Sequence, residues 1–436
     1  MQTSGYARWF RASTPYISAH RGRTFVVLLG GEAIAHANLA NIVHDLALLH
    51  VLGVRVVLVH GARPQIDEAL PDSRFHGHRR ITDRDSMDVL LGLYGRIRSN
   101  LEALFSTGLP TSPLRDVDIA TATGNFVVAR PIGVLDGIDH LFTGRVRRIH
   151  GDRIRALLDA RTLVILSPMG YSPSGQVFNL ASDELAAEVA LALKADKLIM
   201  FDSTGYVRDE HGRELTDVIP AELETLLERT EPEPYVANQL RAMLRACRGG
   251  VPRCHLVSYV EDGALLQELF TAQGHGTELS EARGSRVRPA RSDDVAGIVE
   301  VIRPLEEAGV LVRRDRDRLE LEIGNFLVAE LDGIVVGCCA LYPWKDTAEL
   351  ACVAVHEAYR GAGLKPGIGE RLLEAAEAEA RKAGIGRLFV LTTQTRDWFA
   401  EHGFEEADVS ALPAPKQALY NYQRNSKVMI KYLEAR

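Results

Sequence analysis

A glycine-rich loop in the C-terminal half of the sequence is the first feature that could do chemistry. It spans residues 360–369, after the apolar stretch Glu349–Val355 and before a segment with apolar residues at helical spacing. Glycines leave backbone amides bare, and the first turn of a helix adds the positive end of its dipole. The loop therefore predicts a site for an anionic group, although a short glycine motif is a weak signal when taken alone.

Two glycine turns in the N-terminal half could hold a phosphate in a similar way. Gly30-Gly31 follows the apolar run Thr24–Leu29, and His60-Gly61 follows Val54–Val59. The residues after the first turn repeat their apolar positions at helical spacing. Short buried strands that alternate with amphipathic helices predict an α/β domain whose parallel-rich sheet is covered on both faces.

The C-terminal half carries a second α/β pattern. Residues 276–287 are polar and lack periodicity, so we interpret them as a linker and expect domains at residues 1–280 and 281–436. After a helix that begins near residue 295, we expect strands at Asn325–Glu330, Ile334–Tyr342, Glu349–Val355 and Arg387–Leu391. Leu331-Asp332-Gly333 is typical of the turn of a hairpin between the first two strands.

Composition narrows the class of protein. The 436 residues are 46% hydrophobic and carry a net charge of −7, which gives no basic footprint for nucleic acid or an anionic membrane. No apolar run approaches the ~20 residues that span a bilayer, and the first residues do not resemble a secretory signal. The five cysteines have no CxxC spacing, so we expect no structural zinc and a reducing, cytoplasmic environment.

The N-terminal half resembles the amino-acid kinase family, and within it the branch of the arginine pathway. The resemblance covers about residues 16–280 and includes both glycine turns, Phe178–Asp183 and Lys194–Ile199, in the family's order. It implies an α/β sandwich around a parallel-rich central sheet.

Three residues depart from that family's phosphate-binding pattern. Leu28 stands where the family has a lysine, and phosphoryl transfer needs a fixed cation. Ala62 and Arg63 add side chains where bare backbone would cradle a phosphate. These departures indicate a domain without kinase activity. The alternative is a kinase that uses Lys194 or Lys197 instead.

Members of this branch that are inhibited by arginine share two further features with the sequence, an N-terminal helix and a C-terminal segment. The resemblance implies that Glu268 binds the guanidinium of L-arginine, a bidentate geometry that suits a carboxylate. His255 and the backbone of Gly274 and Gly276 would line the same pocket, and Tyr16 of the N-terminal helix would close it. The alternative is a core histidine and a solvated helix carboxylate. Because this helix is also an oligomer contact in the family, we expect a homo-oligomer and suspect a hexamer.

The C-terminal half resembles the Gcn5-related N-acetyltransferase (GNAT) family in its opening strand, its hairpin and its glycine loop. In that family the loop holds the pyrophosphate of coenzyme A, and the strand before it pairs with the pantetheine arm. The loop here is longer than the family pattern and allows two registers; we favour the second, which abuts the helix. The implied CoA-binding residues are Cys352, Val353 and Ala354 on the strand and Gly361, Gly363, Gly367 and Gly369 in the loop.

Acetyl transfer to an amine needs an oxyanion donor, a base and an acid. The resemblance implies that an amide near Cys352 or Val353 polarises the thioester carbonyl. Glu349 is the candidate base, acting through water; the alternative is a solvated carboxylate at a strand end. Thr392 is the candidate relay to the departing sulfur, unless its hydroxyl only bonds the backbone. No histidine is placed to activate Cys352, so we expect no acyl-enzyme.

The whole chain resembles the N-acetylglutamate synthase family, which combines these two domains. The distinctive segments are Arg303–Glu307, Arg313-Arg314 and the Arg-Asn-Ser stretch at residues 424–426. The resemblance implies that Arg314, Arg424 and Ser426 bind the carboxylates of L-glutamate, which matches the bidentate fork of arginine. A solvated charge run is the alternative for Arg313-Arg314.

This resemblance implies a complete reaction. Acetyl-CoA and L-glutamate would give N-acetyl-L-glutamate and CoA, the first step of arginine biosynthesis, under feedback inhibition by L-arginine. It implies no metal and no permanently bound cofactor, since acetyl-CoA is a co-substrate. Three alternatives stay open: a bifunctional synthase and kinase, a non-catalytic arginine-binding regulator, and an acetyltransferase that acts on another amine.

Overall fold

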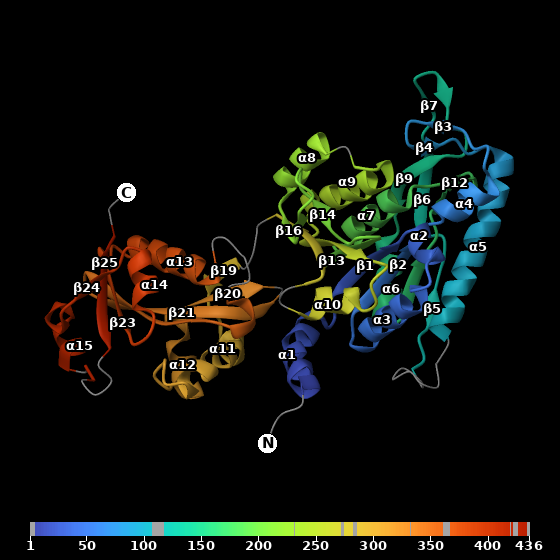
Figure 1. Cartoon of the computed structure of the whole chain (residues 1–436). Coiled ribbons are helices and arrows are strands. Elements are labelled where there is room, and N and C mark those ends of the chain that lie inside the picture. The colour runs from blue at the N-terminus through green and yellow to red at the C-terminus, as the bar shows by residue number, and fades with distance from the viewer. Residues whose placement is uncertain are drawn as a thin grey trace. The chain divides into compact units, whose positions relative to one another are not determined.

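The computed structural model describes residues 5–106, 117–230, 232–271, 274–281, 286–331, 333–360, 367–418, 420–421 and 426–433, with side chains from residue 13 onward. The chain forms two compact units, Met1–Arg283 and Gly284–Arg436. Each unit combines a sheet with covering helices (Figure 1), which confirms the predicted α/β class.

Unit 1 is built on an eight-stranded sheet in the order β16-β18-β17-β13-β1-β2-β10-β5. The strands from β17 to β5 run parallel, and β18 is antiparallel to β17. The strands are β1 Thr24–Leu29, β2 Arg55–His60, β5 Thr121–Ala122, β10 Leu163–Leu166, β13 Lys197–Asp202, β16 Asp217–Val218, β17 Arg253–Ser258 and β18 Gly276–Ser280.

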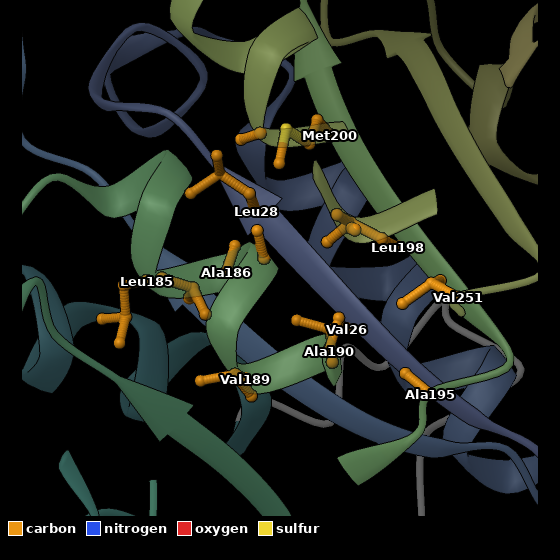
Figure 2. Packing of buried hydrophobic residues seen from close by; sticks show 14 of the residues in the cluster. Val26, Leu28, Leu185, Ala186, Val189, Ala190, Ala195, Leu198, Met200 and Val251 are labelled. Carbon is orange, nitrogen blue, oxygen red and sulfur yellow. The ribbon is translucent and has the colours of Figure 1, made fainter. Parts of the chain in front are cut away.

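Strand β1 shows why both faces of this sheet are covered. Phe25 and Val27 are fully buried in one hydrophobic cluster, whereas Val26 and Leu28 are fully buried in the other. Figure 2 shows Val26 and Leu28 beside the residues of helix α7 (Ser182–Leu193). Because neighbouring side chains point to opposite faces, a continuous apolar run requires helices on both sides.

Each hydrophobic cluster contains residues from one layer of helices. One layer contains α2 Gly31–Ala35, α3 Leu39–Val51, α4 Arg63–Ala69, α5 Arg84–Ser106 and α10 Ala264–Phe270. The other contains α6 Gly151–Asp159, α7, α8 Pro220–Arg229 and α9 Pro234–Arg248. The N-terminal helix α1 spans Gly5–His20, and His20 Nε2 lies 2.8 Å from the carbonyl oxygen of Leu269 in α10.

Smaller sheets complete unit 1. A four-stranded sheet has the order β12-β11-β6-β9, and three two-stranded hairpins accompany it. The bounds are β3 Phe75–His76, β4 Arg79–Arg80, β6 Val127–Pro131, β7 Val134–Leu135, β8 Ile138–Asp139, β9 Gly144–Ile149, β11 Met169–Tyr171, β12 Val177–Asn179, β14 Val207–Arg208 and β15 Glu214–Leu215.

Unit 2 is built on a seven-stranded sheet in the order β19-β20-β21-β22-β23-β25-β24. The strands are β19 Arg286–Pro289, β20 Phe326–Leu331, β21 Ile334–Trp344, β22 Thr347–Val355, β23 Arg387–Thr392, β24 Glu405–Ala407 and β25 Lys427–Tyr432. The helices are α11 Val295–Glu307, α12 Arg316–Glu322, α13 Ile368–Lys382, α14 Arg396–Glu401 and α15 Ala414–Ala418, with short 3₁₀ turns at Ser292–Asp294, Ile323–Asn325, Glu357–Tyr359 and Val409–Ala411.

The expected linker differs from the structure at both of its ends. Gly276–Ser280 forms strand β18, which pairs with β17, and β19 already begins at Arg286. β18 was not expected because its sequence is polar and lacks apolar alternation. It forms a strand because it pairs with the buried strand β17. Among the described helices, none has the length and hydropathy needed to cross a membrane.

Candidate active site and effector site

Two strands at the centre of the unit 2 sheet run parallel and then diverge. β22 pairs with β21 from Thr347 to Val355, but it pairs with β23 only from Thr347 to Glu349. Both strands continue further, and the described residues contain no β22–β23 pairing beyond this point. The backbone of β22 after Glu349 therefore has an open side on which an extended ligand can form hydrogen bonds.

A β-bulge lies in the open part of β22. Cys338 pairs with Ala354 and Ala340 pairs with Ala351, so Cys352 and Val353 together oppose a single residue of β21. The backbone of Cys352 has a φ of 52°, a conformation that non-glycine residues seldom adopt. A bulge disrupts the regular ladder of hydrogen bonds, so Cys352 and Val353 depart from regular pairing with β21 in the open part of β22.

Glu349 lies where the two strands separate. It is paired with Tyr342 on one side and Phe389 on the other, and only 8% of it is exposed. The ammonium of Lys416, on α15, lies 2.6 Å from Glu349 Oε2. A buried carboxylate needs such a partner to remain charged. Glu349 is therefore a fixed carboxylate inside the sheet, not the solvated strand end that was the alternative.

Arginines and glutamates from three segments surround a cavity of about 460 Å³ beside α11. The backbone N–H of Arg314 donates to Glu306 Oε1 at 2.8 Å, and its guanidinium donates to the carbonyl oxygen of Val312 at 3.2 Å. The two arginine-rich segments singled out in the sequence therefore meet at one cavity. Its charged lining residues are Arg303, Glu306, Glu307, Arg313, Arg314 and Arg316.

Tyr342 links Glu349, where β22 and β23 separate, to Glu322 of α12. It is the register partner of Glu349, and its hydroxyl donates to Glu322 Oε2 at 2.6 Å. Burial and the bond to Glu322 raise the pKa of Tyr342, whereas the nearby charge of Arg314 lowers it. Its phenol therefore stays protonated and holds the Glu322 carboxylate in place.

Two further predicted site residues of unit 2, Thr392 and Ser426, have hydrogen bonds within the unit. The hydroxyl of Thr392 is 2.8 Å from that of Thr395 and accepts the Thr395 N–H at 3.0 Å. Side chains alternate along a strand, so Thr392 lies on the opposite face of β23 from Phe389, the partner of Glu349. Ser426 lies at the start of β25, where its carbonyl oxygen accepts the Tyr420 hydroxyl at 2.5 Å.

The glycine loop is described only at its end. Gly361, Gly363 and Arg424 lie outside the described residues. Gly367 caps α13, and its N–H donates to Glu370 Oε2 at 2.9 Å. A Cβ on Gly369 would lie 3.2 Å from the indole of Trp398, so α14 packs closely on the start of α13.

The predicted effector residues of unit 1 meet at the edge of its sheet. Glu268 of α10 accepts twice: Oε1 lies 2.6 Å from His255 Nδ1, and Oε2 takes the backbone N–H of His275 at 2.6 Å. Burial raises the pKa of Glu268, but these bonds and the charge of Lys197 outweigh it and hold the pKa below its usual range. The Glu268 side chain is 5% exposed, so it does not fit the alternative of a solvated helix carboxylate. His255 is buried with a partner at each ring nitrogen, which is compatible with the alternative of a core histidine.

Gly274 is required here for two reasons. Its φ is +67°, and a Cβ would lie 2.6 Å from Glu268 Oε2. Gly276 opens β18, where a Cβ would lie 2.3 Å from the carbonyl oxygen of Leu256. Tyr16 of α1 packs, half-buried, against the same hydrophobic cluster as Leu269 of α10.

Several residues of these sites were missed by the sequence analysis. Lys416 lies in a polar stretch without a motif, far from Glu349 along the chain. Tyr342 could have been found, because strict alternation along β21 and β22 puts it on the face of Glu349. Lys197 had been considered only for kinase chemistry, but its ammonium lies 3.2 Å from His255 Nε2.

Several features of unit 1 bear on the expected loss of the nucleotide cradle. Leu28 is fully buried beside α7 (Figure 2), and its apolar side chain supplies no cation there. The hydroxyl of Tyr235 fills the space beside Gly30, since a Cβ there would lie 2.0 Å from it. Lys197 pairs with Phe25 at the amino end of the parallel strands, whereas the glycine turns lie at their carboxyl end. Lys194 caps α7 just before the same amino end.

Known proteins resemble the chain over nearly its full length. Residues 23–258 match the amino acid kinase family, and residues 322–406 match the acetyltransferase (GNAT) domain. The amino-acid acetyltransferase of Azotobacter vinelandii (strain DJ) is 49% identical over 434 residues, which cover 98% of this chain and 99% of that protein. The chain belongs to the amino-acid acetyltransferase family.

Other relatives agree with this assignment. The amino-acid acetyltransferase of Aeromonas salmonicida (strain A449) is 47% identical over 97% of both chains. The crystal structure of N-acetylglutamate synthase from Neisseria gonorrhoeae, complexed with coenzyme A and L-arginine, has a TM-score of 0.85 at 34% identity and covers 99% of this chain and all of that one. The same enzyme with coenzyme A and N-acetyl-glutamate gives a TM-score of 0.62. This amino-acid acetyltransferase is thus an acyltransferase with an amino-acid kinase fold in unit 1 and a GNAT fold in unit 2.

Proposed function

We propose that this acetyltransferase makes N-acetyl-L-glutamate and CoA from acetyl-CoA and L-glutamate, the first step of arginine biosynthesis. The observation that carries the proposal is the divergence of β22 from β23 at Glu349, close to an arginine-lined cavity. The divergence suits a thioester with an extended arm, and the arginines suit an amino acid with two carboxylates. The crystal structures of the Neisseria enzyme with CoA, N-acetyl-glutamate and arginine support the same substrates and effector.

The acetyl-CoA arm is assigned to the open side of β22. Its amide groups would bond the backbone of Cys352, Val353 and Ala354, and the bulge amides would stabilise the oxyanion of the tetrahedral intermediate. The pyrophosphate is assigned to the glycine loop, through Gly361 and Gly363 or through Gly367 and Gly369. Because Glu370 already accepts the Gly367 N–H, Gly369 is the better donor of the second pair.

Catalysis is assigned to Glu349 as the base. Its carboxylate would take a proton from the glutamate ammonium through a water molecule, and the neutral amine would attack the thioester carbonyl directly. The intermediate would collapse with loss of the CoA thiolate, which would take a proton from water, because Thr392, the candidate relay, lies on the opposite face of β23 from Phe389, the partner of Glu349. No acyl-enzyme forms on Cys352, because its thiol is buried and packs in the cluster beside α11.

Substrate selection is assigned to three residues. Arg314 at the cavity, with Arg424 and Ser426, would hold the two carboxylates of L-glutamate. Four arginines line the cavity against two glutamates, which favours a dianionic substrate over a polyamine.

Regulation is assigned to unit 1. L-arginine would bind at Glu268, His255 and the backbone of Gly274 and Gly276, with Tyr16 at the mouth of the site. Both Glu268 oxygens keep a second lone pair for a guanidinium, because each accepts one bond in the described residues. We also infer a cytoplasmic homo-oligomer, suspected to be a hexamer, with α1 as a contact between subunits.

The deciding experiment measures free thiol released from acetyl-CoA by the full chain with L-glutamate, L-aspartate or L-glutamine, with and without L-arginine. We expect L-glutamate to react at least about tenfold faster than the others and L-arginine to slow it. No thiol release with any amino acid would favour a non-catalytic arginine-binding regulator. ATP consumption with N-acetylglutamate, measured in parallel, would instead reveal a bifunctional synthase and kinase.

A further inference from the structure

Tyr342 is a neighbour both of the candidate base and of Arg314, the arginine assigned to L-glutamate. It pairs with Glu349 across β21 and β22, and residues directly opposite in an antiparallel pair share one face, about 4.5–5.5 Å apart at Cβ. Its ring packs, partly buried, against the cluster beside α11, and its hydroxyl reaches Glu322 of α12. The catalytic steps assigned to unit 2 do not use this hydroxyl.

Glu322 gives the Tyr342 hydroxyl a fixed direction. Its Oε2 accepts the phenol proton at 2.6 Å, and its Oε1 accepts Arg318 Nε–H at 2.8 Å. Burial raises the pKa of Glu322, but the bonds from Tyr342 and Arg318 outweigh this effect and hold the pKa below its usual range. Glu322 is therefore an ionised acceptor. A phenol that gives its proton to such an acceptor keeps its oxygen lone pairs for a donor on the other side.

Arg314 supplies that donor. Burial and the bond to Glu322 raise the pKa of Tyr342, whereas the charge of Arg314 and its hydrogen bond to the phenol lower it. The same guanidinium donates to the carbonyl oxygen of Val312 at 3.2 Å, and the Arg314 backbone N–H donates to Glu306 Oε1 at 2.8 Å. A guanidinium has five N–H donors, so these contacts orient the group and leave further donors for a carboxylate.

We propose that Tyr342 is a positioning residue for L-glutamate, because its hydroxyl, secured by Glu322, aims the Arg314 guanidinium at a substrate carboxylate. The inference rests on the proposed function, in which Arg314 binds L-glutamate. A long side chain loses much rotamer freedom when it binds. A guanidinium that is already oriented loses less on binding and holds the substrate more tightly. Because Tyr342 also pairs with Glu349, this orientation is set beside the base.

Tyr342→Phe removes the hydroxyl and keeps the ring. We expect the KM for L-glutamate to rise about three- to tenfold, the range for one hydrogen bond. The kcat and the KM for acetyl-CoA should stay within about twofold, whereas a residue that only supported the fold would move all three values together. Thiol release from the full chain under steady-state conditions measures them. Tyr432→Phe, which removes a hydroxyl from an exposed tyrosine on β25, is the matched control and should keep the parental values.

Variants of Glu322 test the same chain of contacts without altering the tyrosine. Glu322→Leu frees the phenol and should raise the KM for L-glutamate as Tyr342→Phe does. Glu322→Gln keeps an acceptor for the phenol, so its KM should stay within about twofold of the parent.

A double variant tests whether the effect passes through Arg314. In an Arg314→Gln background, Tyr342→Phe should add less than about twofold to the KM for L-glutamate, because no guanidinium is left to orient. A parental KM in both Tyr342→Phe and Glu322→Leu would overturn the positioning role, as would a full effect of Tyr342→Phe in the Arg314→Gln background. A parent that releases no thiol with L-glutamate would instead overturn the proposed function, and this inference with it.

Discussion

The ammonium of Lys416 lies 2.6 Å from the carboxylate of Glu349, at the point where β22 and β23 separate. This ion pair holds the Glu349 carboxylate in one position within the sheet. A general base must lie at a fixed distance from the proton that it takes. Lys416 is therefore a positioning residue for the proposed base, supplied by a short helix that carries no recognisable motif.

Lys416→Met should lower kcat by about tenfold or more, because the Glu349 carboxylate loses the ammonium that holds it in place. The KM for acetyl-CoA should stay within about twofold. Lys382→Met, which removes an exposed lysine paired with Glu379, is the control. Equal kcat values in both variants would separate Lys416 from the base.

Glu349→Gln keeps the shape of the side chain and removes its basicity. We expect kcat to fall by about 10²-fold or more, the usual contribution of a general base, while acetyl-CoA binds as before. Glu357→Gln, at an exposed position after the same strand, should keep the parental rate. Steady-state kinetics with equilibrium binding of CoA measures both quantities, and a kcat close to the parent would exclude Glu349 as the base.

Arg314→Gln should raise the KM for L-glutamate by about tenfold or more, since one bidentate pair is worth at least about 1.4 kcal/mol. The KM for acetyl-CoA should stay within about twofold. Arg424→Ala should behave alike, and Arg291→Gln, an exposed arginine outside the cavity, is the control. Equal increases in both KM values would mean that Arg314 supports the fold rather than the substrate.

Glu268→Gln should relieve inhibition by L-arginine and leave the uninhibited rate within about twofold. The amide cannot pair with a guanidinium, and it also weakens the bond to His255. Gln267→Ala, the exposed neighbour on α10, serves as control. Rates across a series of arginine concentrations measure the effect, and unchanged inhibition would remove Glu268 from the effector site.

Asp45 predicts a pH-dependent stability. Burial, with the nearby charge of Asp262, raises its pKa to about 7 in the folded protein. Between about pH 4 and pH 7 the unfolded chain has lost this proton while the folded chain keeps it, so stability falls as the pH rises. Asp45→Asn should therefore raise the Tm at pH 8 relative to the parent, by the equivalent of about 1–2 kcal/mol, with a smaller difference near pH 4. Asp88→Asn, exposed on α5, is the control, and equal Tm changes at both pH values would contradict the assignment.

The apolar strands could be predicted closely from the sequence. β20, β21, β22 and β23 lie within two residues of their expected bounds, because apolar runs bounded by turns mark buried strands. β18 was not predicted, since a five-residue polar strand depends on the partner that it pairs with. The local sequence pattern thus predicted which residues each strand buries, but it did not predict every pairing between strands.

The candidate sites were predictable to a similar extent. Family motifs led to Glu349, Arg314 and Glu268, whose surroundings in the structure are buried or charged as those motifs imply. The bulge at Cys352 could not be predicted, because a register shift is a property of two strands together. Lys416 could not be predicted either, because its contact with Glu349 joins segments that are distant along the chain.

Leu28 has a consequence for any attempt to engineer kinase chemistry into unit 1. A lysine at this position would have to ionise among Val26, Ala186 and Met200, whose apolar side chains cannot solvate an ammonium (Figure 2). Replacing this leucine alone would therefore destabilise the fold, and the helix and strand residues around it would have to be redesigned together with it.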